Sequence, residues 1–386
     1  MKKQQHILFS YGCPPKQGFG SPIIVNRHLR RLSSNWEISI VAPQQSFTGI
    51  NFPDFWQPIP LPMRRWWWLP YCPQISKLLE IRFWYWQLEC ERVLLQKRPT
   101  AIVTVLYDIY SIFAAYLAKT WQVPLSVIIH DQEEVRAKSE VEHHLIRKNW
   151  KSVLNQATKI WSVSQELGDL YKANNPDKIS TLIPIPEGSN QSFATWKDKF
   201  TASPVVAYAG NIYPSQISDI YSIASTLQKI NGTFLLVTPK NRPGVVELLN
   251  AFPNIEYQEP FPRNADVISF LKNKASCILV LYPFNLSEFP WGATSFPSKL
   301  VEFSHLGLPV LILAPPDTAL GSWATKHNWY SYLSRMDEEK LFQIINQLTE
   351  KEKWIQMAHQ SQIVAKSEFN PNLIQAQFES EIATVR

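Results

Sequence analysis

The sequence has little cysteine, and its cysteines do not form a recognisable site. Only four of the 386 residues are cysteine, and no two of them stand in a Cys-x-x-Cys spacing. This pattern indicates neither a disulfide framework nor a zinc site. The sequence also lacks an Asp-x-Asp motif that would hold a divalent cation. We therefore expect no metal and no other cofactor.

Long apolar runs and nucleic-acid motifs are lacking as well. No stretch approaches the roughly 18 apolar residues of a membrane-spanning helix. The first apolar segment, His6–Tyr11, is too short for the core of a signal peptide, and no cleavage site follows it. We expect the protein in the cytoplasm. No basic run is dense enough for a nucleic-acid arm, so we expect no nucleic-acid partner.

Positive charge is concentrated in the first half of the chain. The formal net charge is +6. Residues 1–195 hold 22 Lys and Arg against 15 Asp and Glu, whereas residues 196–386 hold 16 against 17. The first half is therefore expected to face an anionic partner, such as a lipid headgroup or a phosphorylated acceptor.

Short apolar runs alternate with amphipathic segments along the chain. Most runs are continuous rather than alternating, which is typical of parallel strands buried on both faces. The predicted strands are His6–Tyr11, Glu37–Pro43, Ala101–Leu106, Pro124–His130, Lys159–Ser164, Pro204–Gly210, Thr233–Pro239, Ser276–Pro283 and Pro309–Ala314. The predicted helices between them include Ile109–Trp121, Gln165–Ala173, Ser215–Ile230 and Arg263–Lys274.

This strand–helix alternation occurs twice, and it predicts βαβ units with parallel sheets. The polar segment Ser189–Ser203 separates the two series and is typical of a linker. We predict an α/β protein with two doubly wound, Rossmann-like domains, residues 1–195 and 196–370. A ligand is expected in the cleft between them, beyond the carboxyl ends of the strands. Residues 371–386 are expected to form a helix that packs back across the first domain.

The most informative segment is residues 296–310, Phe-Pro-Ser-Lys-Leu-Val-Glu-Phe-Ser-His-Leu-Gly-Leu-Pro-Val. Pro297 suits a first helical turn, and Ser298 can serve the free N–H groups of that turn. Gly307 followed by Pro309 ends the helix. A short helix followed at once by a buried strand is therefore predicted.

The chemistry of this helix suits a nucleotide. Its N-terminus offers free N–H groups and the positive end of a dipole, and Lys299 adds a point charge beside them. Glu302 lies four residues after Ser298, on the same helical face, where a carboxylate can accept hydrogen bonds from a ribose diol. An ordinary capped helix before a core strand is the alternative for this segment taken alone.

Residues 296–310 resemble the nucleotide-sugar site of retaining glycosyltransferases of family 4, which have the GT-B fold. Their pattern is Pro-Ser-Lys-Leu, then Glu, a small-residue turn, Gly, any residue, Pro and a valine-rich strand. The resemblance implies that Ser298, Lys299 and Leu300 hold the donor diphosphate and that Glu302 holds the ribose. It also implies transfer of a sugar from a nucleoside diphosphate to an acceptor hydroxyl with retention of configuration. The helix N-terminus and Lys299 would stabilise the leaving diphosphate.

Other segments fit the same family. Gly18 and Gly20 follow the first strand, where the family has a glycine loop that approaches the donor phosphates. His130 ends a strand at the position where a family histidine faces the transferred sugar. The remaining candidates for donor binding are Gly210 and Asn211, after the first strand of the second domain, and Phe261, after a predicted strand, where the base-binding loop lies. Tight turns and a structural histidine are the alternative interpretations.

The sequence departs from the family at three positions. Thr294 stands where many members have a first glutamate, and Asn211 and Gln216 occupy the region of an arginine and a lysine. These changes motivate an alternative function, a catalytically weak nucleotide-sugar-binding subunit that supports a partner transferase. A sugar-nucleotide epimerase is a third hypothesis with the same fold.

An aromatic and basic segment points to a membrane surface. Residues 63–70 read Met-Arg-Arg-Trp-Trp-Trp-Leu-Pro, and Ile75–Leu95 carries Trp84, Tyr85 and Trp86 among basic residues. Tryptophan beside arginine suits a bilayer interface. We expect peripheral contact through Trp66, Trp67 and Trp68 at the inner face of the plasma membrane, with a saccharide or lipid-linked acceptor in polysaccharide or glycolipid biosynthesis. An aromatic cluster filling the core of the first domain is the alternative.

Overall fold

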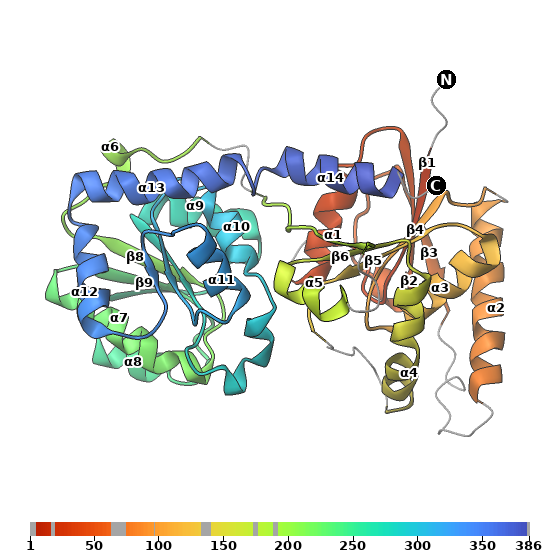
Figure 1. Ribbon diagram of the computed structural model, residues 1–386, viewed down its shortest axis with the longest axis horizontal. Helices are drawn as coiled ribbons and strands as arrows, with labels where there is room; N and C mark the ends of the chain where they lie inside the picture. The colour runs from red at the N-terminus through yellow and green to blue at the C-terminus, as the bar shows by residue number, and fades with distance from the viewer. Residues whose placement is uncertain are drawn as a thin grey trace. The chain divides into compact units, whose positions relative to one another are not determined.

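The computed structural model describes residues 5–16, 20–62, 75–95, 97–132, 140–172, 177–187 and 192–383. The chain divides into two compact units. Unit 1 is residues 1–182 together with 375–386, and unit 2 is residues 183–374. The division falls between Leu182 and Ile183, whereas the polar segment Ser189–Ser203 predicts a boundary at residue 195. Figure 1 shows that each unit has a sheet with helices around it.

The described strands of unit 1 form a seven-stranded parallel sheet in the order β3-β2-β1-β4-β5-β6-β7. The strands are β1 (Gln5–Ser10), β2 (Trp36–Pro43), β3 (Trp56–Leu61), β4 (Ala101–Val105), β5 (Leu125–Ile129), β6 (Lys159–Ser162) and β7 (Ile179–Thr181). The order reverses between β1 and β4, as in a doubly wound fold.

The helices of unit 1 connect these strands. They are α1 (Ser21–Arg30), η1 (Gln44–Phe47), α2 (Ile75–Leu94), α3 (Ile109–Trp121), α4 (Glu140–Gln156) and α5 (Gln165–Lys172). The last helix, α14 (Pro371–Ala383), belongs to unit 1 from Gln375 onward. The Phe378 ring lies 5.1 Å from the Trp161 ring and 4.7 Å from that of His28, so α14 contributes to the core of this unit.

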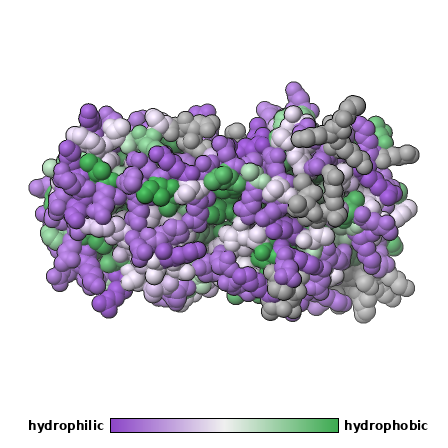
Figure 2. All heavy atoms as spheres, turned by 45° about the horizontal axis from the view of Figure 1, so that its top comes forward, coloured by the Kyte–Doolittle hydropathy of each residue, from purple (hydrophilic) through white to green (hydrophobic). Residues whose placement is uncertain are grey.

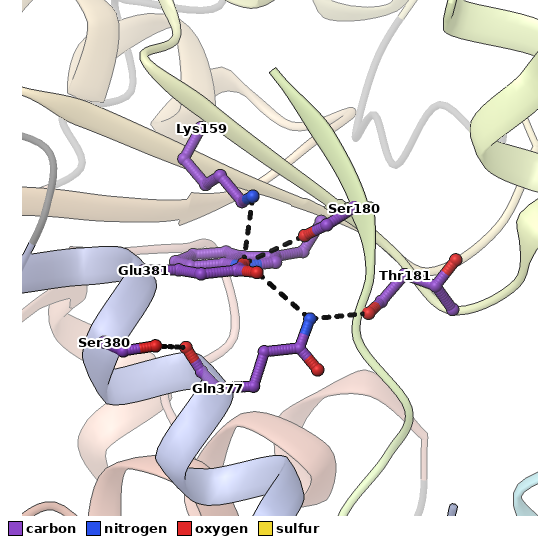
Figure 3. Close-up of polar contacts among 7 residues, drawn as sticks. Lys159, Ser180, Thr181, Gln377, Ser380 and Glu381 are labelled. Carbon is purple, nitrogen blue, oxygen red and sulfur yellow. Dashed lines mark hydrogen bonds and ion pairs between the residues drawn. The ribbon is translucent and has the colours of Figure 1, made fainter. Parts of the chain in front are cut away.

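A polar network also fastens α14 to the unit 1 sheet (Figure 3). The Glu381 carboxylate accepts hydrogen bonds from the Trp161 indole N–H and the Ser180 hydroxyl, and it forms an ion pair with Lys159 at 3.1 Å. Gln377 donates to the backbone carbonyl of Thr181 at 3.0 Å and to Glu381 at 3.1 Å. The C-terminal helix is therefore held by directional bonds as well as by apolar packing.

Unit 2 repeats the doubly wound arrangement with a six-stranded parallel sheet in the order β10-β9-β8-β11-β12-β13. The strands are β8 (Val205–Ala209), β9 (Thr233–Val237), β10 (Ile255–Gln258), β11 (Cys277–Leu281), β12 (Val310–Leu313) and β13 (Tyr332–Leu333). Here the order reverses between β8 and β11.

The helices of unit 2 surround this sheet (Figure 1). They are α6 (Trp196–Lys199), η3 (Pro214–Gln216), α7 (Ile217–Lys229), α8 (Val245–Ala251), α9 (Asn264–Lys274), η4 (Leu286–Glu288), η5 (Pro290–Ala293), α10 (Ser298–Ser304), α11 (Ala319–Lys326), α12 (Glu338–Gln347) and α13 (Lys351–Lys366). Together with the first sheet, this arrangement confirms the predicted fold class of two doubly wound α/β domains.

The strands are buried because helices cover the sheets. Every residue of β4, β5, β11 and β12 is buried, which agrees with their continuous apolar sequences. On the face drawn in Figure 2, hydrophilic side chains predominate and hydrophobic ones occur in small patches. Within the described part of the chain, no helix is long and apolar enough to cross a bilayer.

Candidate functional site

The order of the unit 2 strands singles out the carboxyl ends of β8 and β11, where the chain connections diverge. In doubly wound sheets, ligands bind outside this point. The chain leaves β8 through Gly210, whose φ of +143° is one that residues with a side chain rarely adopt. The Gly210 N–H donates to the carbonyl of Val237 at 2.9 Å, so the turn is tied to the end of β9.

Lys299 reaches the same turn from the first part of α10. Its ammonium lies 4.8 Å from the centre of the Tyr208 ring, which favours a cation–π interaction. A Cβ placed on Gly210 would come within 1.8 Å of the Lys299 Nζ atom. The absence of a side chain at Gly210 therefore makes room for the lysine.

The Lys299 ammonium has a perturbed environment. Burial lowers the pKa of Lys299 to about 8, because the surroundings disfavour its charged form. Among the residues that the structure describes, Lys299 has no carboxylate within ion-pair distance. A half-buried cation without a carboxylate partner is suited to an anionic ligand.

Glu302 lies one turn further along α10 and is buried, with 5% of its surface exposed. Its Oε1 atom accepts a hydrogen bond from the Asn264 side chain at 3.0 Å and another from the backbone N–H of Glu187 at 2.9 Å. The two donors come from different parts of the chain, the first residue of α9 and the backbone at Glu187, and both bind the same carboxylate oxygen. The orientation of Glu302 is therefore fixed by groups from outside its own helix.

The start of α10 differs from expectation. Pro297 occupies the N-cap position, Ser298 is the first helical residue, and the cap has no side-chain hydrogen bond. The expectation that Ser298 serves the free N–H groups of the turn is corrected, because its hydroxyl is not at the capping position. Ser298 is exposed. Leu300 is fully buried in the unit 2 core, and its N–H donates to Pro297, so its place in the structure is explained by packing.

The residues after Gly210 bond mainly within the fold. The Gln216 side chain donates to the carbonyl of Leu281 at 2.9 Å and accepts from the N–H of Tyr213 at 3.0 Å. Gln216 thus links β11 to the turn rather than facing outward. Asn211 is exposed, and its side-chain oxygen accepts from Arg242 at 3.0 Å, which brings a second cation to the carboxyl end of the sheet.

Phe261 and Thr294 lie in the loops that flank this site. Phe261 is half-buried, and its ring lies 5.1 Å from that of Phe270 in α9. Thr294 is 6% exposed, and its N–H donates to the backbone carbonyl of Trp291. Neither residue brings a charge to the site.

The candidates in unit 1 are described separately. His130 follows β5 directly, is 8% exposed, and lies near the buried His28 of α1. Gly20 is the N-cap of α1 with a φ of +75°, a conformation that favours glycine. Gly18 lies outside the described residues. At the order reversal of this sheet, the N–H of Gly12 donates to the Asp108 carboxylate at 2.6 Å.

The aromatic segment of α2 has two faces. Trp86 is fully buried, and the buried Arg82 lies 5.7 Å from the centre of its ring, so these two belong to the core. The opposite face exposes Ile81, Trp84 and Leu88, at 52%, 55% and 42%. The hypothesis of a core cluster is thus correct for Trp86, whereas Trp84 faces outward. Trp66, Trp67 and Trp68 lie outside the described residues.

Sequence reasoning missed two residues of the site, Tyr208 beneath Lys299 and Asn264 beside Glu302. No motif marks either of them, because Tyr208 lies in an apolar strand and Asn264 begins an ordinary helix. Within the described ranges, no group of three or more His, Cys, Asp or Glu side chains is placed to hold a metal ion. The reaction without a metal stays a prediction.

No protein-family model matches this sequence, and no curated protein matches it by sequence. Solved structures do match. The glycosyltransferase from Rickettsia africae ESF-5 has a TM-score of 0.66 and 12% identity, over 100% of this chain and 99% of that one. Anabaena Alr3699/HepE, in complex with UDP and glucose, has a TM-score of 0.63 and 14% identity, over 98% and 100%.

A third similar structure is AviGT4, a glycosyltransferase involved in avilamycin A biosynthesis, with a TM-score of 0.54 and 10% identity over 98% of this chain and 97% of that one. Identities this low bear on the fold alone. The chain folds into two doubly wound units, and its alignments with these three structures extend over nearly the whole length of both chains. The chain has the GT-B fold of these glycosyltransferases.

Proposed function

We propose that the protein is a glycosyltransferase that moves a sugar from a nucleoside-diphosphate sugar to an acceptor hydroxyl. The observation that carries this proposal is the Lys299 ammonium, held against Gly210 and over Tyr208 at the carboxyl edge of the unit 2 sheet. The helix α10 has only seven residues, so its dipole is short. We therefore assign binding of the donor diphosphate to the Lys299 ammonium rather than to the N-terminus of the helix. Similar structures with UDP and UDP-glucose support a nucleotide-sugar donor.

The proposed reaction breaks the bond between the anomeric carbon of the sugar and the diphosphate oxygen. A new bond forms between that carbon and the acceptor oxygen. The acceptor proton passes to the leaving diphosphate, so no protein base is required. Lys299 stabilises the negative charge that develops on the leaving group. Glu302 holds the ribose, and His130 orients hydroxyl groups of the transferred sugar.

Retention of anomeric configuration follows from the resemblance to family 4. The expected acceptor is a saccharide or a lipid-linked sugar. Product analysis by NMR tests the stereochemistry directly, because the coupling constant of the new anomeric proton distinguishes the two outcomes. An inverted product would contradict the family 4 assignment while leaving the transferase proposal intact.

The donor is tested by calorimetric titration of UDP, GDP, ADP and dTDP into the purified protein. We expect selective binding of one nucleotide, weakened by Lys299→Met and by Glu302→Ala. Lys229→Met is the control, because that lysine is exposed at the end of α7. Absence of binding to all four nucleotides at millimolar concentration would overturn the proposal.

A second candidate function is a nucleotide-sugar-binding subunit that supports a partner transferase. It is favoured by Thr294, which brings no carboxylate, and by Gln216, whose side chain is engaged by the fold. The two functions differ in turnover. An enzyme releases nucleoside diphosphate in proportion to added acceptor, whereas a binding subunit holds the nucleotide sugar without release.

Peripheral membrane contact is proposed for unit 1. On α2, Ile81, Trp84 and Leu88 are spaced by three and four residues, so they form one exposed apolar stripe on a helix whose other face is already buried. A stripe with tryptophan suits the bilayer interface. The excess of basic residues in the first half of the chain favours an anionic lipid surface.

Vesicle co-sedimentation tests this contact. The full chain is expected to bind vesicles that contain phosphatidylglycerol more strongly than neutral ones. The triple change Ile81→Ser, Trp84→Ser and Leu88→Ser should reduce that binding, as should serine at Trp66, Trp67 and Trp68. Equal binding by the folded variants and the parent would refute the membrane proposal.

A further inference from the structure

We propose that Asn264 is a positioning residue that fixes the Glu302 carboxylate for a ribose diol. Asn264 would thereby set a preference for ribonucleotides over 2′-deoxyribonucleotides. This inference rests on the proposed function, in which Glu302 contacts the ribose of the donor. It adds a residue that lies outside the segment of family resemblance and 38 positions from Glu302 in the chain.

The contact determines which end of the Asn264 amide faces Glu302. An ionised carboxylate only accepts hydrogen bonds, so the amide must present its NH2 group. The Nδ2 atom lies 3.0 Å from Glu302 Oε1, within the range of a charge-assisted hydrogen bond. The backbone N–H of Glu187 reaches the same oxygen at 2.9 Å.

Two donors on one oxygen fix the plane of the carboxylate. Rotation about the last side-chain bond of Glu302 would break both hydrogen bonds, so the position of Oε2 is fixed as well. A carboxylate can accept about four hydrogen bonds in all, so one carboxylate can serve protein donors and the hydroxyl groups of a diol at the same time. Because Glu302 is 5% exposed, loss of one donor would leave a buried charge less well satisfied.

Asn264 is itself held in place. It is the first residue of α9, and the residue before it, Arg263, forms an ion pair with Asp266 at 2.7 Å. Phe261 packs on Phe270 of the same helix, with ring centres 5.1 Å apart. Both contacts join the loop before Asn264 to α9. The amide therefore approaches Glu302 from the first residue of a helix, and a helix positions side chains more precisely than a loop does.

The test compares the dissociation constants of UDP and 2′-deoxy-UDP, or of the matching pair if titration selects another base. The parent protein is expected to prefer the ribonucleotide by about tenfold, which corresponds to about 1.4 kcal/mol. Asn264→Ala should reduce this preference to about twofold. Binding of both nucleotides should persist, because Lys299 is unchanged.

Two further variants distinguish a positioning effect on Glu302 from a general loss of structure in the binding site. Asn264→Asp keeps the shape but replaces the donor with a carboxylate that repels Glu302, and it should also lose the preference. In Asn264→Ala/Glu302→Ala, the preference should equal that of Glu302→Ala alone, as expected when one residue acts through the other. The matched control is Asn254→Ala, because Asn254 donates to the backbone of Ala224 in the same unit.

The outcomes are distinct. If folded Asn264→Ala and Asn264→Asp keep the preference of the parent while Glu302→Ala loses it, the inference is wrong and the donor site stands. The inference is also wrong if the parent binds both nucleotides equally. If the parent binds no nucleotide, both the proposed function and this inference are wrong.

Discussion

The Lys299 side chain lies so close to Gly210 that the two positions are mutually dependent. A Cβ on Gly210 would come within 1.8 Å of the ammonium nitrogen and 2.5 Å of Cε, whereas van der Waals contact requires more than 3 Å. The glycine and the lysine are far apart in sequence, on the turn after β8 and on α10. The Lys299 ammonium can therefore occupy its position at the carboxyl edge of the unit 2 sheet only because residue 210 is a glycine.

Gly210→Ala is expected to displace Lys299 and to lower nucleotide affinity about tenfold or more. The strained φ should also cost about 1 to 3 kcal/mol of unfolding free energy. Calorimetric titration and urea denaturation measure the two effects. Gly49→Ala is the matched control, since Gly49 also has positive φ, at +74°, but has no atom within 4 Å of the added Cβ. Unchanged nucleotide affinity in folded Gly210→Ala would contradict the assignment of Lys299 to the diphosphate.

Nucleotide affinity should depend on the protonation of Lys299. Because burial lowers its pKa to about 8, the free protein loses this positive charge as pH rises above 8. The association constant should then fall by up to about tenfold per pH unit. The ligand contributes little to this slope, since the last phosphate proton is lost near pH 6. Titrations between pH 7 and 9.5 measure the effect.

Lys299→Arg provides the comparison for the pH profile. Its guanidinium stays charged over the whole range, so affinity should be flat with pH even if it is lower at pH 7. Lys229→Arg, at an exposed position, should keep the slope of the parent. A flat profile in the parent would show that the Lys299 charge plays no part in binding.

Glu381→Ala should destabilise unit 1 by about 2 to 3 kcal/mol, because it leaves Trp161, Ser180 and Lys159 without their shared acceptor. Urea denaturation followed by tryptophan fluorescence measures the change. The neighbouring Glu379→Ala is the control, with an expected loss below about 1 kcal/mol. Equal effects of the two changes would contradict the role given to the Glu381 network (Figure 3).

The same network predicts sensitivity to acid. Burial would raise the pKa of Glu381, but its hydrogen bonds and Lys159 outweigh burial and hold the pKa below the usual value. Glu381 therefore contributes stability that is present above the unfolded pKa, about 4.5, and is lost as pH falls through the folded value. The difference in unfolding free energy between the parent and Glu381→Ala should shrink as pH falls below about 4.5.

His28 should make unit 1 less stable at mildly acidic pH. Burial, with smaller contributions from His130, Arg31 and Arg27, lowers the pKa of His28 to about 3, while a hydrogen bond with Gln375 opposes the shift. The unfolded chain takes up a proton near pH 6.5 that the folded chain does not. The unfolding free energy should therefore fall as pH drops below 6.5, by at most about 1.4 kcal/mol per pH unit.

His28→Gln removes this titration. Its unfolding free energy should vary less between pH 7.5 and 5 than that of the parent, even though the loss of packing on Phe378 lowers stability at every pH. Urea midpoints at pH 7.5, 6 and 5 measure the slopes. Parallel slopes in the two proteins would exclude His28 as the cause.

The inner strands could be predicted because they are buried on both faces. Val310–Leu313 has no polar residue, and all four of its side chains are buried. Edge strands carry a weaker signal. In β3, Trp56, Ile59 and Leu61 are buried while the intervening residues, including Pro58 and Pro60, are exposed. Proline is tolerated there because an edge strand has one unpaired side, and neither β3, β7 nor β13 was anticipated from the sequence.

The faces of α2 show a second limit of sequence reasoning. Trp84 and Trp86 are two positions apart in one aromatic segment, and composition treats them alike. The structure buries Trp86 against Tyr110, with ring centres 5.2 Å apart, and leaves Trp84 55% exposed. The difference depends on which side of the helix meets α3, which is a property of packing.

The sequence by itself determined the parallel α/β architecture and the presence of Lys299 and Glu302 on one short helix. Both depend on local periodicity and spacing, which act within a few residues. The tertiary structure alone decided that Gly210 makes room for Lys299 and that Asn264 orients Glu302. Strand order and crossover connections bring these residues together from distant parts of the chain, and no local pattern records such a contact.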